Sequence, residues 1–231
     1  MMHDPLGCDD CPVREIAVCA GLGEVERRDL ARLGRRKSYR RGETIFAAGD
    51  SSIACATLVS GAVKLSRFDA QGTERTVALL HPAGFLARLF AVEIDCTATA
   101  LSDCTLCLFP RDVVERQMRS HSDFMERVLR ATSEQLASAH NLIDLIGRRD
   151  ARARVTGLLL IFAEGSCDGP LADGQLLDLP LTRGEVANFL GLTIETVSRQ
   201  LTILEAEGAI AREGPRGIRL LRVAALAPPT D

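Results

Sequence analysis

Residues 182–208 have the sequence TRGEVANFLGLTIETVSRQLTILEAEG, which contains the start and stop signals of two short helices. Thr182 is a good N-cap residue, and Glu185 three positions later completes a capping box that begins the first helix. Gly191 ends this helix, and Thr193 caps the second, which we expect to continue to the end of the stretch. The stretch therefore predicts a helix-turn-helix.

The two helices share an apolar interior and leave one polar face on the second helix. The interior positions are Val186, Leu190, Leu192, Val197, Leu201 and Leu204. Glu195, Ser198 and Arg199 lie at helical spacing on the other side, near the N-terminus of the second helix. A recognition helix inserts this end into the major groove, where Arg can bind guanine, Glu can accept from cytosine and Ser can contact a base or a phosphate. A solvent-exposed face with an ordinary Glu and Arg would show the same pattern.

The segment after the two helices favours the DNA-binding interpretation. Two short apolar runs flank residues 213–217, which have the sequence EGPRG, so we expect a β-hairpin. Arg212, Arg216 and Arg219 lie near its tip and on its strands, where cations can contact phosphates. The whole segment therefore predicts a winged helix-turn-helix that binds double-stranded DNA.

Composition excludes several other classes of protein. With 231 residues, 46% of them hydrophobic, the chain is long enough for one large domain or two small ones. Its formal net charge of -3 means that any contact with nucleic acid comes from a local surface. No apolar run is long enough to span a bilayer, and residues 1–7 lack the features of a signal peptide. We therefore expect a cytoplasmic protein without membrane contact, whose eight cysteines are not a disulfide framework.

Four regions of the chain separate by pattern, and together they predict an α+β fold. Residues 1–21 form a cysteine-rich head. Residues 22–110 contain short apolar runs with glycine turns about every ten residues, which predicts an antiparallel β jelly roll as a sensor domain. Residues 111–147 contain no proline and have the periodicity of a long helix, while residues 148–231 contain the winged helix-turn-helix.

The long helical region carries more apolar residues than one small sandwich can cover. A second copy of the same helix is the simplest partner, which would make the protein a homodimer. A helix packed wholly within its own chain is the alternative. Asp144 lies in the same apolar run, and a like charge facing its twin would weaken such a dimer. A solvent-facing Asp144 is the other interpretation.

Several motifs resemble the CRP/FNR family of bacterial regulators, and the resemblance covers nearly the whole chain. Residues 179–199 resemble the DNA-binding signature of that family, while residues 41–50 and 61–65 are similar to its jelly roll. The resemblance implies a homodimer that binds a palindromic operator, with two recognition helices one DNA turn apart. In the FNR branch, the residues matching Glu195, Ser198 and Arg199 read half-sites resembling TTGAT. Activation or repression would depend on the position of the operator relative to RNA polymerase.

A cyclic nucleotide is not the expected signal. The jelly roll of this family often holds the nucleotide with a Gly-Glu pair followed by Arg and Ser or Thr. The corresponding residues 83–90, with the sequence AGFLARLF, have neither pair. Arg88 is the one candidate cation in that stretch, and a surface residue is the simpler interpretation of it.

The head supplies a different candidate sensor, because Cys8, Cys11 and Cys19 lie within twelve residues. Two thiolates at positions i and i+3 can chelate one centre from a turn, and a third can reach it after a short helical segment. Zinc binding, redox exchange and chance also produce a C-x2-C pair. Taken with the family resemblance, the pattern implies an FNR-type head that holds an oxygen-labile 4Fe-4S cluster.

A fourth ligand is expected beside the three thiolates, and the resemblance implies that it is Cys107. Cys96 and Cys104 are the alternatives. Cys104 and Cys107 are three residues apart, so strand alternation places them on opposite faces. Cys55 and Cys167 are expected to be small buried hydrophobes or ordinary thiols.

The working hypothesis is an oxygen-responsive global transcription regulator that binds a TTGAT-type palindrome while its cluster is intact. One alternative is a regulator of the same fold that senses a haem-bound gas, zinc or thiol oxidation. A dithiol redox enzyme using Cys8 and Cys11 is a weaker alternative, because no thioredoxin-like context surrounds the pair. No other catalytic motif is found, so we do not expect an enzyme.

Overall fold

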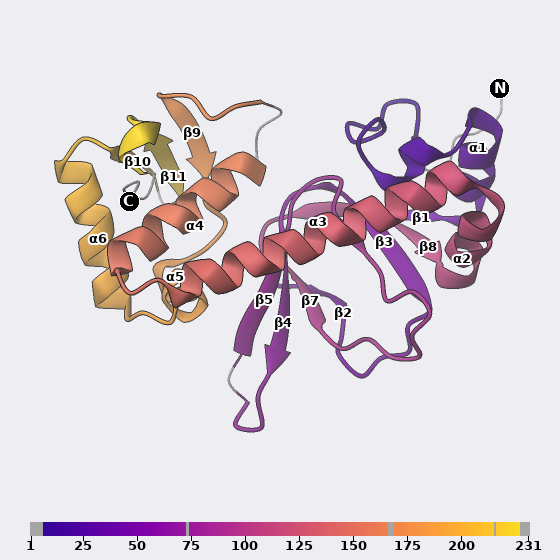
Figure 1. Ribbon diagram of the computed structural model, residues 1–231, viewed down its shortest axis with the longest axis horizontal. Coiled ribbons are helices and arrows are strands. Elements are labelled where there is room, and N and C mark those ends of the chain that lie inside the picture. Colours follow the sequence, from indigo (N-terminus) through magenta and orange to yellow (C-terminus); the bar gives the residue numbers. More distant parts are fainter. Residues whose placement is uncertain (1–6, 73, 166–168, 215, 227–231) are drawn as a thin grey trace. The chain divides into compact units, whose positions relative to one another are not determined.

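The computed structural model describes residues 7–72, 74–165, 169–214 and 216–226 (Figure 1). Contacts divide the chain into two compact units, one ending at Ala139 and one beginning at His140. Cys167 and Pro215 lie outside the described residues.

The first unit is an antiparallel sandwich. Its strands in the described part of the chain are β1 (Arg35–Tyr39), β2 (Thr44–Phe46), β3 (Ala54–Ser60), β4 (Val63–Phe68), β5 (Glu74–Leu80), β6 (Phe85–Leu86), β7 (Thr97–Ala100) and β8 (Cys104–Pro110). They form two four-stranded sheets within that part, with strand orders β1-β8-β3-β6 and β2-β7-β4-β5. One hydrophobic core takes side chains from both sheets, including Tyr39, Leu58, Val63 and Leu106. The expected β jelly roll is therefore confirmed.

A second core lies on the other face of the sheet that contains β8. It joins that sheet to the 3-10 turn η1 (Val18–Gly21) and to the helices α1 (Glu24–Leu33), α2 (Arg111–Ser120) and α3 (Ser122–Gly147). Val13, Leu30, Phe109 and Phe124 are among its buried members. The cysteine-rich head thus packs directly on the sheet.

The helical run after β8 is divided into two helices, where the sequence predicts one. His121 has an extended backbone, with φ -131° and ψ 105°, and it ends α2. Its carbonyl then accepts the backbone N–H of Met125, so the same residue begins the hydrogen-bond ladder of α3. A helix can therefore end here without a proline or a glycine.

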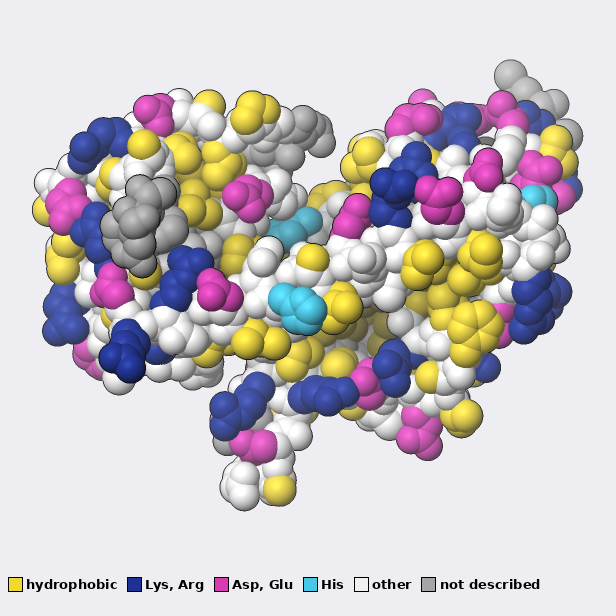
Figure 2. Space-filling view, in the orientation of Figure 1, with side chains coloured by type: hydrophobic (Ala, Val, Ile, Leu, Met, Phe, Trp, Pro, Cys, Tyr) yellow, Lys and Arg dark blue, Asp and Glu magenta, His cyan; other side chains and the backbone are white. Residues whose placement is uncertain are grey.

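α3 carries an exposed apolar stripe. Leu129, Leu136 and Ile143 are 68%, 57% and 69% exposed and recur every seven residues, so they lie along one side of the helix. Met125 extends the stripe by one turn. Hydrophobic side chains are visible at the surface along the course of α3 in Figure 2. Leu142 and Leu145 are instead buried.

The second unit contains α4 (Ala151–Gly165), β9 (Gln175–Asp178), α5 (Arg183–Leu190), α6 (Ile194–Ala206), β10 (Ile210–Glu213), β11 (Gly217–Leu220) and the 3-10 turn η2 (Val223–Ala225). Its described strands form a sheet of order β10-β11-β9. The expected helix-turn-helix and hairpin wing are confirmed, and β9 joins the wing as a third strand. Within the described residues, no helix has the length and apolar character needed to cross a membrane.

Local signals in the sequence account for the tight turn between α5 and α6. The Thr182 hydroxyl accepts the backbone N–H of Glu185 at 3.2 Å, and the Glu185 carboxylate accepts the backbone N–H of Thr182 at 2.7 Å. Gly191 has φ 62° and ψ 39°, a left-handed conformation that glycine adopts without a steric cost. Thr193 then accepts the Thr196 N–H at 3.2 Å and begins α6.

Candidate functional site

The exposed face of α6 is the candidate DNA interface. Glu195 and Arg199 are exposed near the N-terminus of the helix, and Ser198 is half-buried one turn after Glu195. Val197, Leu201 and Leu204 on the other side are buried against the rest of the unit. Glu195 and Arg199 are therefore accessible from outside the unit, Ser198 is partly accessible, and none of the three belongs to the buried core.

Hydrogen bonds from Arg183 and Thr193 affect Ser198 and Glu195, respectively. Arg183, the first residue of α5, donates from Nη1 to Ser198 Oγ at 3.3 Å. Hydrogen bonds from its own backbone N–H and from the Thr193 side chain lower the pKa of Glu195. The carboxylate is therefore ionised near neutral pH and can accept a hydrogen bond. Arg183 is a functional candidate that the sequence did not single out.

The wing offers fewer unpaired cations than its sequence suggests. Arg212 donates from Nε to Glu205 Oε2 at 2.8 Å, and Arg219 donates from Nη2 to Glu213 Oε2 at 2.9 Å. Arg216 is exposed. Arg216 is consequently the wing residue best placed to meet a phosphate.

The second candidate site is a cavity beneath the head, which we call the cysteine cavity. The cysteines that line it in the described part of the chain are Cys8, Cys11, Cys19 and Cys107. Arg14, Arg27 and Arg36 line it as well, together with apolar side chains such as Leu30 and Phe109. Residues from three separate segments of the sequence thus meet around one space.

Different elements bring the four cysteines to this cavity. The backbone N–H of Cys11 contacts the Cys8 carbonyl at 3.4 Å, which holds the two residues in one turn. Cys19 lies in η1, and Cys107 lies on β8 opposite Arg36 of β1 and Thr57 of β3. All three head cysteines pack against the core that contains Cys107.

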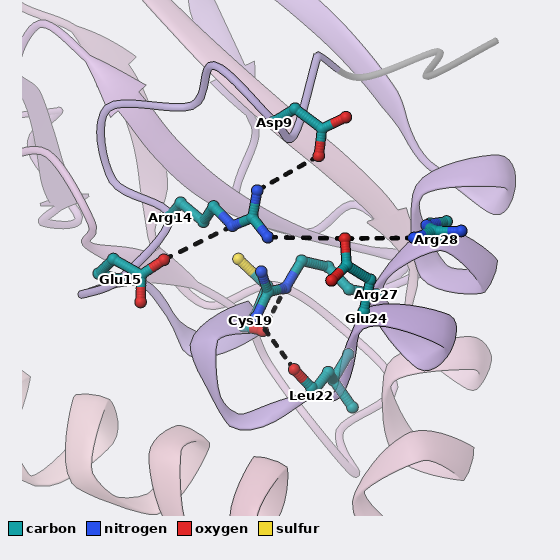
Figure 3. Close-up of polar contacts among 8 residues, drawn as sticks. All are labelled: Asp9, Arg14, Glu15, Cys19, Leu22, Glu24, Arg27 and Arg28. Atoms are coloured by element: carbon teal, nitrogen blue, oxygen red, sulfur yellow. Dashed lines mark hydrogen bonds and ion pairs between the residues drawn. The ribbon is translucent and has the colours of Figure 1, made fainter. Parts of the chain in front are cut away.

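Ion pairs and hydrogen bonds fix the head around the cavity (Figure 3). The Arg14 guanidinium lies 3.2 Å from Asp9 Oδ1, 3.5 Å from Glu15 Oε1 and 3.9 Å from Glu24 Oε1. The Arg27 guanidinium donates to the carbonyls of Cys19 and Leu22 at 3.3 and 3.0 Å. The chain around the cysteines is therefore held by side chains that the sequence analysis did not identify.

The donor set fits a metal cluster in its chemistry. Burial, together with the charges of Cys11 and Cys107, raises the pKa of the Cys19 thiol to about 11 against the lowering effect of Arg27. Such thiols need added positive charge to lose their protons, which a metal centre supplies. Among the described residues, no three His, Cys, Asp or Glu side chains are close enough to hold a single metal ion. The cysteines therefore surround a space and do not converge on one point.

The other cysteines lie elsewhere in the first unit. Cys104 is buried in the core between the two sheets, where burial raises its pKa to about 11. Cys96 accepts a hydrogen bond from Arg67 Nε at 3.4 Å. Cys55 is completely buried, and burial raises its pKa to about 12. None of these three lines the cysteine cavity in the described part of the chain.

Two charged residues considered in the sequence have partners within the chain. Arg88 Nε lies 3.2 Å from Asp95 Oδ1, so this cation is engaged at the surface of the jelly roll. Asp144 is 70% exposed and lies 2.9 Å from Arg148 Nη2, one turn further along α3. The contact of Arg88 favours its surface interpretation, whereas the exposure of Asp144 in a single chain fits both a solvent-facing and a dimer-facing carboxylate.

Comparison with known proteins gives matches over both units. Residues 153–228 match the Crp-like helix-turn-helix domain, and residues 36–121 match the cyclic nucleotide-binding domain. The transcriptional activator protein FnrL of Cereibacter sphaeroides is 36% identical over 214 residues, which are 91% of this chain and 86% of the relative. The nitrogen fixation regulation protein FixK of Bradyrhizobium diazoefficiens is 33% identical, over 91% of this chain and 90% of its own length.

A solved structure agrees with these sequence matches. The structure of FixK2 from Bradyrhizobium japonicum has a TM-score of 0.75 and 26% identity, over 84% of this chain and 95% of that chain. The matches to these relatives therefore cover most of this chain and most of their own lengths.

Proposed function

The chain belongs to the CRP/FNR family of transcription regulators, and from that premise we propose that it is an oxygen-responsive regulator acting as a homodimer on a palindromic DNA site. Its relatives are DNA-binding transcription regulators and not enzymes. We expect it to act in the cytoplasm, where thiols are kept reduced. Its effect at a promoter would depend on where the operator lies relative to RNA polymerase.

The exposed face of α6 supports a specific operator. Arg199 is exposed, and among the described residues it has no ion-pair or hydrogen-bond partner that would hold it away from DNA. Glu195 is available as an ionised acceptor, and Ser198 is oriented by Arg183. The Arg199 guanidinium suits guanine, the Glu195 carboxylate suits cytosine, and the Ser198 hydroxyl suits either a base or a phosphate. We therefore propose that each subunit reads a half-site resembling TTGAT.

The apolar stripe on α3 supports the dimer. Leu129, Leu136 and Ile143 would remain in water if the chain were a monomer, and burying them against a second copy is favourable. Their seven-residue spacing suits two α3 helices packed side by side. A two-fold dimer presents two α6 helices, which matches the symmetry of a palindrome.

The cysteine cavity is the observation that carries the sensory part of the proposal. Cys8, Cys11, Cys19 and Cys107 would hold a 4Fe-4S cluster through their thiolates. When bound, such a cluster supplies sensitivity to oxygen, because oxidation changes its composition and its bonds to the protein. The head packs against α3 through the core containing Phe124 and Val128, so loss of its ligands would loosen the support of the dimer helix. Without the ligated head, the population of DNA-binding dimer would fall.

Strictly anoxic purification tests this proposal. We expect coloured protein that contains iron and sulfide, elutes as a dimer and binds a TTGAT-type palindrome more tightly than a scrambled duplex. Exposure to air should remove the colour and weaken specific binding. A colourless protein that contains zinc, haem or no metal would overturn the cluster, and unchanged binding after exposure to air would overturn the oxygen response. Equal binding to the scrambled duplex would overturn the proposed operator sequence.

A further inference from the structure

We propose that Arg27 is a positioning residue of the cysteine cavity, which holds the turn carrying Cys19 and provides positive charge beside the thiolates. This inference rests on the proposed function, because it concerns how the cavity retains the cluster. Arg27 lies in α1, eight residues after Cys19, and its side chain lines the cavity.

The contacts of Arg27 fix the η1 turn from one side. Its Nε donates to the Cys19 carbonyl at 3.3 Å and its Nη2 donates to the Leu22 carbonyl at 3.0 Å (Figure 3). These carbonyls belong to the ligand residue and to the residue that follows the turn. A planar guanidinium can bridge two acceptors in this way, whereas an ammonium group cannot match the same fork.

The first turn of α3 confines η1 from another side. A Cβ atom placed on Gly21 would lie 2.6 Å from the Asp123 carbonyl oxygen and 2.8 Å from the Phe124 Cα. No side chain fits there without a shift of backbone, so η1 is pressed directly against α3. Arg27 bonds the carbonyls and α3 closely contacts Gly21, so the turn that carries Cys19 is held at two places.

The three arginines around the cavity differ in their charge partners. Arg14 lies within ion-pairing distance of Asp9, Glu15 and Glu24, so its charge is largely balanced. Arg36 is exposed to solvent, which screens its charge. Arg27 is half-buried, and among the described residues no carboxylate lies within ion-pairing distance of it. Arg27 therefore supplies the least compensated positive charge at the cavity.

That charge has a direct consequence for cluster retention. Four thiolates bound to iron and sulfide carry a net negative charge, which a nearby cation stabilises in a partly desolvated site. Side chains that orient ligands without touching the metal typically change metal affinity by about tenfold or more when they are substituted. Arg27→Gln removes both the fork and the charge, while Arg27→Lys keeps the charge alone.

The experiment uses the full chain loaded with iron and sulfide under anoxic conditions. Arg28→Gln is the matched control, because Arg28 is exposed on the same helix, pairs with Glu24 and does not line the cavity. The measurement is the rate at which an iron chelator removes iron in the absence of oxygen. We expect Arg27→Gln to release iron about tenfold faster than the wild type, Arg27→Lys to be intermediate and Arg28→Gln to match the wild type.

Thermal unfolding of the metal-free proteins separates positioning from a general structural role. We expect Arg27→Gln and Arg28→Gln to unfold at similar temperatures without metal, since Arg27 is only half-buried and its two hydrogen bonds support one local turn. Iron release from Arg27→Gln at the wild-type rate would overturn this inference alone, and so would a large drop in its metal-free unfolding temperature. Release from Arg27→Lys as fast as from Arg27→Gln would overturn the electrostatic part. A wild-type chain that takes up no iron and sulfide would overturn the proposed function and this inference with it.

Discussion

Cys104 and Cys107 lie on the same strand, β8, but face different hydrophobic cores. Cys104 contributes to the core between the two sheets, with Tyr39 and Leu58. Cys107 contributes to the core beneath the head and lines the cysteine cavity. A separation of three residues places two strand side chains on opposite faces, so only one of them can reach the head.

The positions of the cysteines predict that substitution of Cys107, but not of Cys104 or Cys96, lowers the iron and sulfide bound. Cys107→Ser should lower the iron and sulfide bound per chain by about tenfold or more after anoxic reconstitution, since it removes a thiolate from the cavity. Cys104→Ala and Cys96→Ala should retain the wild-type content, which the same assay measures. Loss of iron from Cys104→Ala with full retention in Cys107→Ser would contradict the proposed ligand set.

The apolar stripe on α3 predicts that a charge within it prevents dimer formation. Leu136→Glu should shift the protein to monomer, because the two-fold axis would bring two carboxylates together in an apolar interface. Analytical ultracentrifugation measures the change directly. Ala137→Glu is the control, since the adjacent position is also exposed but points away from the stripe. Dimerisation of Leu136→Glu at the wild-type concentration would show that the interface lies elsewhere.

The exposed face of α6 predicts how single substitutions change DNA recognition. Arg199→Ala should cost about 1–3 kcal/mol per half-site and relax the preference at the contacted base pair. Arg216→Ala should weaken binding to all duplexes similarly and reduce the salt dependence, as expected for a phosphate contact. Fluorescence anisotropy with matched and substituted palindromes at several salt concentrations separates the two effects. If Arg199→Ala loses the same affinity for every DNA sequence, Arg199 does not contact a base.

Local signals in the sequence were sufficient to predict the second unit. The capping box at Thr182, the left-handed Gly191 and the cap at Thr193 each depend on neighbours within four residues. Such signals can be recognised without knowledge of the tertiary structure. The jelly roll was predicted for a similar reason, because turns and strands follow one another along the chain.

Features that depend on distant contacts could not be predicted in this way. The break at His121 involves neither proline nor glycine, so the sequence gives no strong signal for it. Arg27 donates hydrogen bonds to backbone carbonyls, and Arg183 donates one to a side chain of another helix. No sequence pattern predicts either contact. The family resemblance implied Cys107, but its proximity to the head depends on how β8 packs beneath η1.

The capping box of α5 predicts a measurable loss of stability when it is broken. Thr182→Ala removes the acceptor for the Glu185 N–H, which typically costs about 1 kcal/mol. The melting temperature should fall by several degrees, about 4–8 °C if the second unit unfolds alone. Thr202→Ala is the control, since its hydroxyl bonds the Ser198 carbonyl within α6 and caps no helix end. Equal melting temperatures for wild type and Thr182→Ala would show that the cap does not support the unit.

Burial of His81 predicts a loss of stability in mildly acidic solution. Burial lowers the pKa of His81, because the cationic imidazolium loses hydration within the protein. The unfolded chain therefore binds a proton at this residue at a higher pH than the folded chain does. Since stability rises with pH wherever the unfolded state binds more protons, stability should fall as the pH drops below the ordinary histidine value of about 6.5 and level off below the folded pKa.

Urea unfolding of the first unit between pH 7.5 and pH 5 measures this dependence, followed by a signal confined to that unit. His81→Gln should flatten the curve across this range, since a side chain that does not titrate replaces the histidine. If His81→Gln loses stability with falling pH as steeply as the wild type, protonation of His81 in the unfolded chain is not the cause. The acid sensitivity would then come from carboxylates such as Glu74, whose pKa is lowered by its hydrogen bond with Lys64 despite the opposing effect of burial.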